Sequence, residues 1–206
     1  MDDLKERLIV RFGKDAVKSI ISPNDKSELF LVELKQKAVF VLITNGLSNY
    51  KMPVNEKLIG REFNELAFCL PSYWEIENFE NERFNWVYTW LEKLSRYVVE
   101  NNTWFGPGHT IPCGKPFRAL SSTMKANHLL LSDPIFLEDE LDPLEMEDKL
   151  IHFLTIIPIF EDEMDYKQGK GTFKLMTKLK NQGVTEKLDD FRATSLKSKW
   201  RLRRKI

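Results

Sequence analysis

The chain has 206 residues, of which 42% are hydrophobic and 30% are charged, so it can bury the core of one large domain. Its 31 basic and 31 acidic residues cancel, which excludes a protein drawn to nucleic acid or anionic lipid by its overall field. No apolar run reaches the roughly 20 residues that span a bilayer, and the N-terminus lacks the apolar core of a secretion signal. Two cysteines do not make a disulfide framework. We therefore expect a cytoplasmic protein with reduced thiols.

A helix is predicted over residues 2–21, with Asp2 or Asp3 as its cap and a break at Gly13. Its first part has apolar residues at helical spacing. A second turn or two would hold Ala16, Val17, Ile20 and Ile21.

Two apolar runs, 29–34 and 38–43, predict a pair of strands, because a short polar link of the kind found in hairpins joins them. Their central residues are nearly all apolar, so both faces of these strands should be covered. Residues 65–71 form a third predicted strand, which Pro71 ends. Residues 75–82 are polar and predict a loop. The clearest helix spans 84–99, with an apolar arc around roughly half its circumference.

The second half alternates in the same way. Residues 101–118 are rich in Gly and Pro and predict a loop, 129–131 a short strand, and 151–160 another strand. Acidic residues at 161–165 suit a helix N-terminus, and Thr172 should cap a further helix that Gly183 closes. This order predicts an α+β (mixed α/β) fold with a helix-covered mixed sheet.

The stretch 44–53 follows the second predicted strand and is dense in turn-forming residues. Gly46 can adopt positive φ without steric cost, so we expect a shaped turn here. We interpret it as an architectural turn, with an interface role as the alternative.

The sequence has no catalytic, phosphate-binding or metalloprotease signature. His109 and Cys113 are four residues apart in the Gly- and Pro-rich loop, where a metal site or a Cys-His nucleophile is conceivable. Further ligands are missing, so we favour a histidine that fixes the loop by hydrogen bonding. We predict no catalytic, cofactor-binding or metal-ligating residue and no cofactor.

Three other features have a structural and a functional interpretation. The acidic segment, residues 138–148, lacks the spacing of a calcium loop; it is either a solvated face or a surface for a basic partner. Trp86, Trp90 and Trp104 are either core or a stacking platform. The basic stretch 197–205 is either a tail, which could rest on the acidic segment, or a nucleic-acid contact. The candidate partner surface is formed by Glu138, Asp139, Glu140, Asp142 and Glu145.

An ordered series of motifs resembles the Suppressor of fused domain family in its stand-alone bacterial form. The turn matches the family's Thr-x-Gly-Met-Ser followed by Met, with Leu47 where methionine is usual. The strand 65–71, with the tryptophan after it, is similar to the family's motif of Glu-Leu, then Leu-Pro, then Trp. Further along, a Thr-Trp pair precedes a loop that resembles the family's Gly-His-Thr loop. The motif residues are Thr44, Gly46, Ser48, Glu65, Pro71, Trp74, Trp104, Gly108, His109 and Thr110.

The resemblance covers residues 27–182 and implies a mixed α/β sandwich, as a single domain over residues 1–183 with a basic extension over 184–206. It also implies protein binding rather than catalysis. Bacterial members of the family look like immunity proteins that block a toxin of a polymorphic toxin system. The alternative is a regulatory adaptor for another protein or for nucleic acid. Membrane binding is not expected, nucleic-acid binding is the less favoured option, and the oligomeric state is open.

Overall fold

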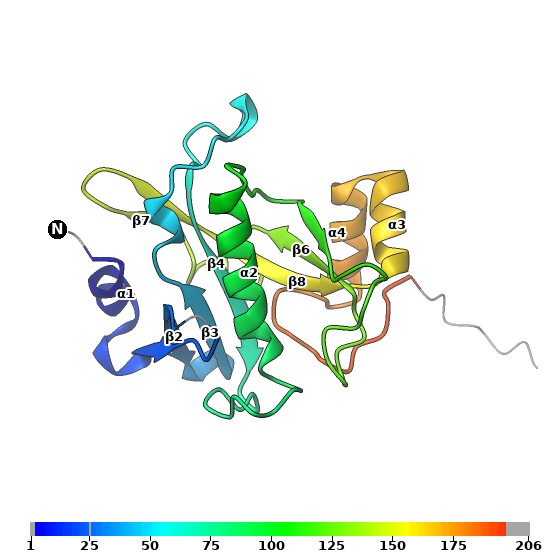
Figure 1. Cartoon of the computed structure of the whole chain (residues 1–206), viewed down its shortest axis with the longest axis horizontal. Helices are drawn as coiled ribbons and strands as arrows, with labels where there is room; N and C mark the ends of the chain where they lie inside the picture. Colours follow the sequence, from blue (N-terminus) through cyan, green and yellow to red (C-terminus); the bar gives the residue numbers. More distant parts are fainter. Residues whose placement is uncertain (1–2, 25, 197–206) are drawn as a thin grey trace, which may run out of the picture.

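The computed structural model describes residues 3–24 and 26–196 (Figure 1). Its helices are α1 (Leu4–Phe12), α2 (Trp86–Glu100), α3 (Glu161–Lys170) and α4 (Thr172–Asn181). Its strands are β1 (Val17–Ile21), β2 (Glu28–Leu34), β3 (Val39–Thr44), β4 (Phe63–Pro71), β5 (Thr110–Pro112), β6 (His128–Ser132), β7 (Leu144–Glu145) and β8 (Leu150–Ile159). They form one 8-stranded sheet in the order β1-β2-β3-β4-β8-β6-β5, with β7 paired to β8.

The sheet is mixed, because one pair of strands is parallel. β1 to β4 form an antiparallel meander, and β5, β6, β7 and β8 also pair antiparallel. The parallel pair is β4 with β8, where Phe63 lies opposite Ile151. The chain between these two strands is long, as a parallel connection requires, and it contains α2.

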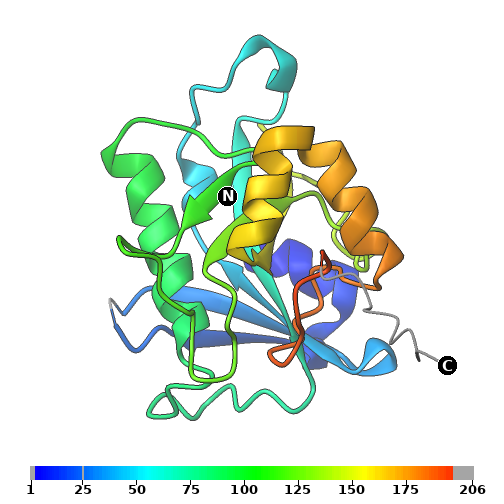
Figure 2. The same cartoon turned by 90° about the vertical axis from the view of Figure 1, so that its right-hand side faces the viewer.

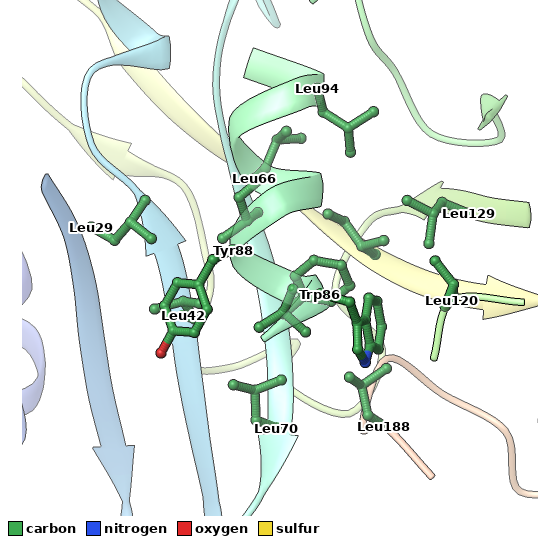
Figure 3. Close-up of a cluster of buried hydrophobic side chains, with 14 of the residues drawn as sticks. Leu29, Leu42, Leu66, Leu70, Trp86, Tyr88, Leu94, Leu120, Leu129 and Leu188 are labelled. Carbon is green, nitrogen blue, oxygen red and sulfur yellow. The ribbon is translucent and has the colours of Figure 1, made fainter. Parts of the chain in front are cut away.

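One face of the sheet is covered by α2, which crosses it in Figure 1. Successive strand residues point to opposite faces, so Leu29 and Leu31 of β2 pack under α2 while Phe30 and Val32 face away. Figure 3 shows the α2 side of the core, where Trp86, Tyr88 and Leu94 of the helix meet leucines of the sheet. This apolar arc explains why α2 was the clearest helix in the sequence.

The opposite face carries two separate covers. α1 packs its buried residues Leu4 and Leu8 against β2 and β3, together with Leu137, Leu141 and Leu144. The α3–α4 pair covers the other half, where Leu175 and Leu179 pack on β6 and β8. Figure 2 shows α2 on one side of the sheet and α3–α4 on the other. The predicted α+β fold with a helix-covered mixed sheet is therefore confirmed.

The predicted strands at 29–34, 38–43, 65–71, 129–131 and 151–160 and the helix at 84–99 are each present within one or two residues. Side chains on both faces of β3 are buried, as its uninterrupted apolar run indicated. Gly46 has a φ of +106°, as expected for the turn after β3.

Three local predictions are wrong. Most of the second helical turn predicted at residues 16–21 is instead strand β1, which follows a short 3-10 helix (Lys14–Ala16), because Val17, Ile20 and Ile21 also suit a strand and pair with β2. The loop 101–118 contains strand β5, which pairs with β6. Thr172 does not cap α4, because it is the first residue inside the helix. The N-cap residue is Gly171, so no side chain caps this helix.

The segment after α4 contacts first the sheet and then α3. The backbone N–H of Leu188 donates to the carbonyl of Cys69 in β4 at 2.9 Å. Buried Glu186 accepts from three consecutive backbone N–H groups, those of residues 135–137, at 2.8 to 2.9 Å. Arg192 holds the buried Glu163 of α3 at 2.7 Å. The predicted basic stretch 197–205 lies outside the described residues.

Candidate functional site

The first motif and Glu65 form one buried cluster at the end of β3. The Glu65 carboxylate accepts hydrogen bonds from the N–H of Gly46 at 3.1 Å and of Ser48 at 2.9 Å. It also accepts from the Thr44 hydroxyl, which in turn accepts from the N–H of Leu66 at 2.9 Å. A single carboxylate on β4 therefore fixes the turn after β3.

The Glu65 side chain is completely buried. Burial raises the pKa of this carboxyl, and the hydrogen bonds from Thr44, Ser48 and Gly46 oppose part of that rise. These three donors complete the carboxylate's bonding within the domain. The cluster is thus built to hold the turn, in line with the architectural interpretation.

The second motif fixes the chain after β4. The N–H of Trp74 donates to the carbonyl of Pro71 at 2.9 Å, and its indole N–H donates to the carbonyl of Phe84 at 3.2 Å. The Trp74 ring packs against Phe84 and Trp86, with centroids 4.8 and 6.0 Å apart. Pro71 and Trp74 therefore anchor the loop that leads into α2.

The third motif shapes the approach to β5. Gly108 has a φ of +89°, and its N–H donates to the carbonyl of Leu131 in β6 at 2.7 Å. A side chain on Gly108 would meet Thr172 at 3.1 Å, so α4 begins directly against this glycine. The His109 ring lies over Trp104, with centroids 4.3 Å apart. Thr110 accepts a hydrogen bond from Lys167 of α3 at 3.4 Å.

An aromatic groove of about 730 Å³ lies between α2 and β5, the last strand of the sheet within the described residues. The half-buried rings of Trp90 and Trp104 and the exposed Tyr97 line it, and Lys93 and Lys167 bring positive charge. Tyr97 stacks on Phe105 with a centroid separation of 6.2 Å. An apolar groove beside a sheet edge is a shape suited to an extended peptide.

The pair His109 and Cys113 lacks the environment of a nucleophilic site. Burial raises the pKa of the Cys113 thiol to about 12, so the thiol stays protonated at neutral pH. Burial and the nearby Lys167 charge lower the pKa of His109. Across residues 3–24 and 26–196, no group of three or more His, Cys, Asp or Glu side chains could hold a metal ion.

The acidic segment, residues 138–148, is exposed to solvent, and contacts with the core and with α1 fix its backbone. Leu137, Leu141 and Leu144 are buried in the core under α1. Arg11 of α1 donates to the backbone carbonyls of Glu140, Asp142 and Pro143. Glu140 forms an ion pair with Lys37 at 2.9 Å. The other six acidic residues of the segment are exposed to solvent: Glu138, Asp139, Asp142, Glu145, Glu147 and Asp148.

The three tryptophans separate into two roles. Trp86 belongs to the core, whereas Trp90 and Trp104 reach the aromatic groove. From the sequence, these tryptophans were either core or a stacking platform, and no groove was predicted. Lys167 was not predicted as part of it, because this residue lies far from α2 in the chain. In the part of the chain that the structure describes, no helix has the length and apolar character needed to cross a membrane.

Comparison with known proteins identifies the family. The Suppressor of fused protein (SUFU) family model matches residues 23–192. This range includes all ten motif residues and extends into the segment after α4. No curated protein matches the sequence.

Solved structures share the fold at low identity. A suppressor of fused homologue from Neisseria gonorrhoeae has a TM-score of 0.66 and 17% identity, and the match covers 94% of this chain and 97% of that one. A chain in the Sufu–Fu complex has a TM-score of 0.62 and 17% identity, with 93% and 90% covered. Drosophila Suppressor of Fused has a TM-score of 0.55 and 19% identity, with 87% of this chain but 42% of the Drosophila chain covered.

Proposed function

The chain belongs to the Suppressor of fused protein family, and on this premise we propose that it is a non-catalytic protein-binding domain. More specifically, we propose an immunity protein that binds and neutralises a cognate toxin of a bacterial polymorphic toxin system. The Sufu–Fu complex supports the binding role, because it holds a family member together with another protein.

The acidic segment is the observation that carries the toxin proposal. Six of its carboxylates are exposed on a backbone that Arg11 and three buried leucines hold in place. A fixed array of like charges attracts a complementary surface, speeds association and loses little entropy on binding. Toxins that cut nucleic acid have basic active-site clefts, so such an array would fit and block one.

The test is co-expression and pull-down with the product of the neighbouring gene. We expect that product to be toxic alone, to be neutralised by this chain and to bind it in a salt-dependent manner. The variant E138Q/D139N/E145Q should lose at least tenfold in affinity, mainly through a slower association rate. A neighbouring product that is not toxic and does not bind contradicts the proposal.

The chain offers a matched control for this experiment. Glu77, Glu80 and Glu82 are exposed in the loop before α2, away from the acidic segment. The variant E77Q/E80Q/E82Q removes the same number of charges and should bind as the wild type does. If both triple variants weaken binding equally, net charge rather than the acidic segment is responsible.

The aromatic groove favours a second candidate, a regulatory adaptor that holds an extended segment of another protein. Trp90, Tyr97 and Trp104 offer large apolar contact at low entropic cost. β5 supplies a sheet edge, although Pro112 has no N–H and shortens the ladder that a peptide could form.

Substitutions on the two surfaces separate the candidates. For an adaptor, Tyr97→Ala should weaken partner binding by about 2 kcal/mol, the size of an aromatic hot spot, and E138Q/D139N/E145Q should have no effect. For an immunity protein that uses the acidic segment, the pattern should reverse. Isothermal titration of the captured partner against both variants measures the difference.

A further inference from the structure

Charge is separated along the molecule although the net charge is zero. The acidic segment carries seven acidic residues and no lysine or arginine. Residues 169–181, at the end of α3 and along α4, carry four lysines and no acidic residue. Figure 1 shows β7 of the acidic segment and α4 toward opposite ends of the long axis.

The outward face of α4 also exposes a large apolar side chain. Leu175 and Leu179 are buried against the sheet, whereas Phe173 retains 84% of its accessible surface. Lys170 and Lys174 are exposed on either side of it in sequence. Burial of this ring in a contact would remove its apolar surface from water, which favours association.

The acidic end has the complementary character. Its exposed carboxylates are opposite in charge to the lysines of α4, and α1, which holds the segment through Arg11, exposes 81% of Val10. The acidic segment and α4 thus carry opposite charges, and α1 and α4 each expose one apolar side chain.

We propose that the basic face of α4 docks onto the acidic segment of a second copy of the chain. The two surfaces differ and lie toward opposite ends, so the contact is heterologous and joins copies head to tail. Phe173 would be buried at the centre of the contact, with lysine–carboxylate pairs around it. The association does not depend on the proposed toxin, and it is measured with the protein alone.

Sedimentation velocity of the full chain at 20 mM and 500 mM salt tests this proposal. We expect concentration-dependent association at low salt and monomers at high salt, because the Debye length shortens to a few ångström. K170E/K174E and E145K/E147K should each weaken association at least about tenfold, and Phe173→Ala several-fold. The control K51E/K57E, with two exposed lysines reversed elsewhere, should associate as the wild type does.

The combined variant K170E/K174E/E145K/E147K is the decisive sample. It exchanges the signs of two residues on each surface and leaves the net charge at zero, so the exchanged pairs can form and part of the association should return at low salt. Monomers of the wild type at 20 mM salt and about 1 mM protein would refute the proposal. So would association that survives K170E/K174E, or a wild type that stays monomeric while its α4 lysines bind anionic vesicles or duplex DNA.

Discussion

Glu65 and Glu145 carry the same functional group in opposite settings. Glu65 is completely buried and receives three hydrogen bonds from the turn after β3, whereas Glu145 is exposed on the acidic segment. A buried carboxylate with its donors is a structural element, and its loss leaves those donors unsatisfied. Exposed carboxylates add little to stability and remain available to a partner. The comparison separates residues that build this domain from residues that can serve its function.

Glu65→Ala is expected to have the largest effect. It removes the acceptor of two backbone N–H groups and one hydroxyl, which should lower the free energy of unfolding by about 3 kcal/mol. Urea unfolding followed by circular dichroism measures this loss. Glu145→Ala is the control and should leave the unfolding midpoint in place. Equal midpoints for both variants would remove the distinction between the two regions.

Gly46→Val should come next. A β-branched side chain at a φ of +106° is strained whatever the space around it, and we expect a loss of about 2 kcal/mol. Gly46→Ala should cost about half as much, because its strain lacks the β-branched contribution. A fully stable Gly46→Val variant that loses partner binding would assign the turn to the interface instead.

The pH dependence should show a smaller effect, located in the other buried carboxylates. Burial raises the pKa of Glu163, but Arg192 and the backbone N–H groups of Ser195 and Phe160 together outweigh this and bring the pKa below its ordinary value of 4.5. Asp190 behaves alike: Arg83, Tyr73 and Thr123 outweigh burial and lower its pKa.

Both groups contribute stability that is complete above their unfolded-state pKa values and is lost as the pH falls through the lower folded-state values. We therefore expect the free energy of unfolding to fall below about pH 4.5, and Arg192→Gln to make that fall shallower. Burial raises the pKa of Glu65, so its contribution lies in a different pH range: it is complete below the ordinary value of 4.5 and is lost as the pH rises through the raised folded-state value. Urea midpoints measured between pH 7 and 3 test the sign, and an unchanged slope in Arg192→Gln contradicts it.

The triple variant E138Q/D139N/E145Q should have the smallest effect on stability. Its side chains are exposed and no buried bond depends on them, so the unfolding midpoint should match that of the wild type. A large loss of stability would show that the acidic segment, like Glu65, is needed to build the domain.

The strands buried on both faces were predictable because burial there demands an uninterrupted apolar run, as in β3. Strand β1 was not predictable, because the spacing of Val17, Ile20 and Ile21 fits both a helix and a strand. Only the pairing with β2 determines that this segment is a strand. The motif residues identified the family, but the bond from Glu65 to the turn depends on the register that sets Ile43 opposite Ala67. The groove was missed because Lys167 joins Trp90 and Trp104 only through the tertiary fold.

The parallel pair of β4 and β8 has a consequence for synthesis of the chain. The meander from β1 to β4 can pair as soon as it leaves the ribosome, since its contacts are local. The second partner of β4, the strand β8, begins only at Leu150. Until β8 has been synthesised, one edge of β4 stays unpaired, although eight of the residues of β4 are buried in the finished fold. An open apolar edge is a template for aggregation. The nascent domain is therefore most vulnerable between the emergence of residue 71 and that of residue 159.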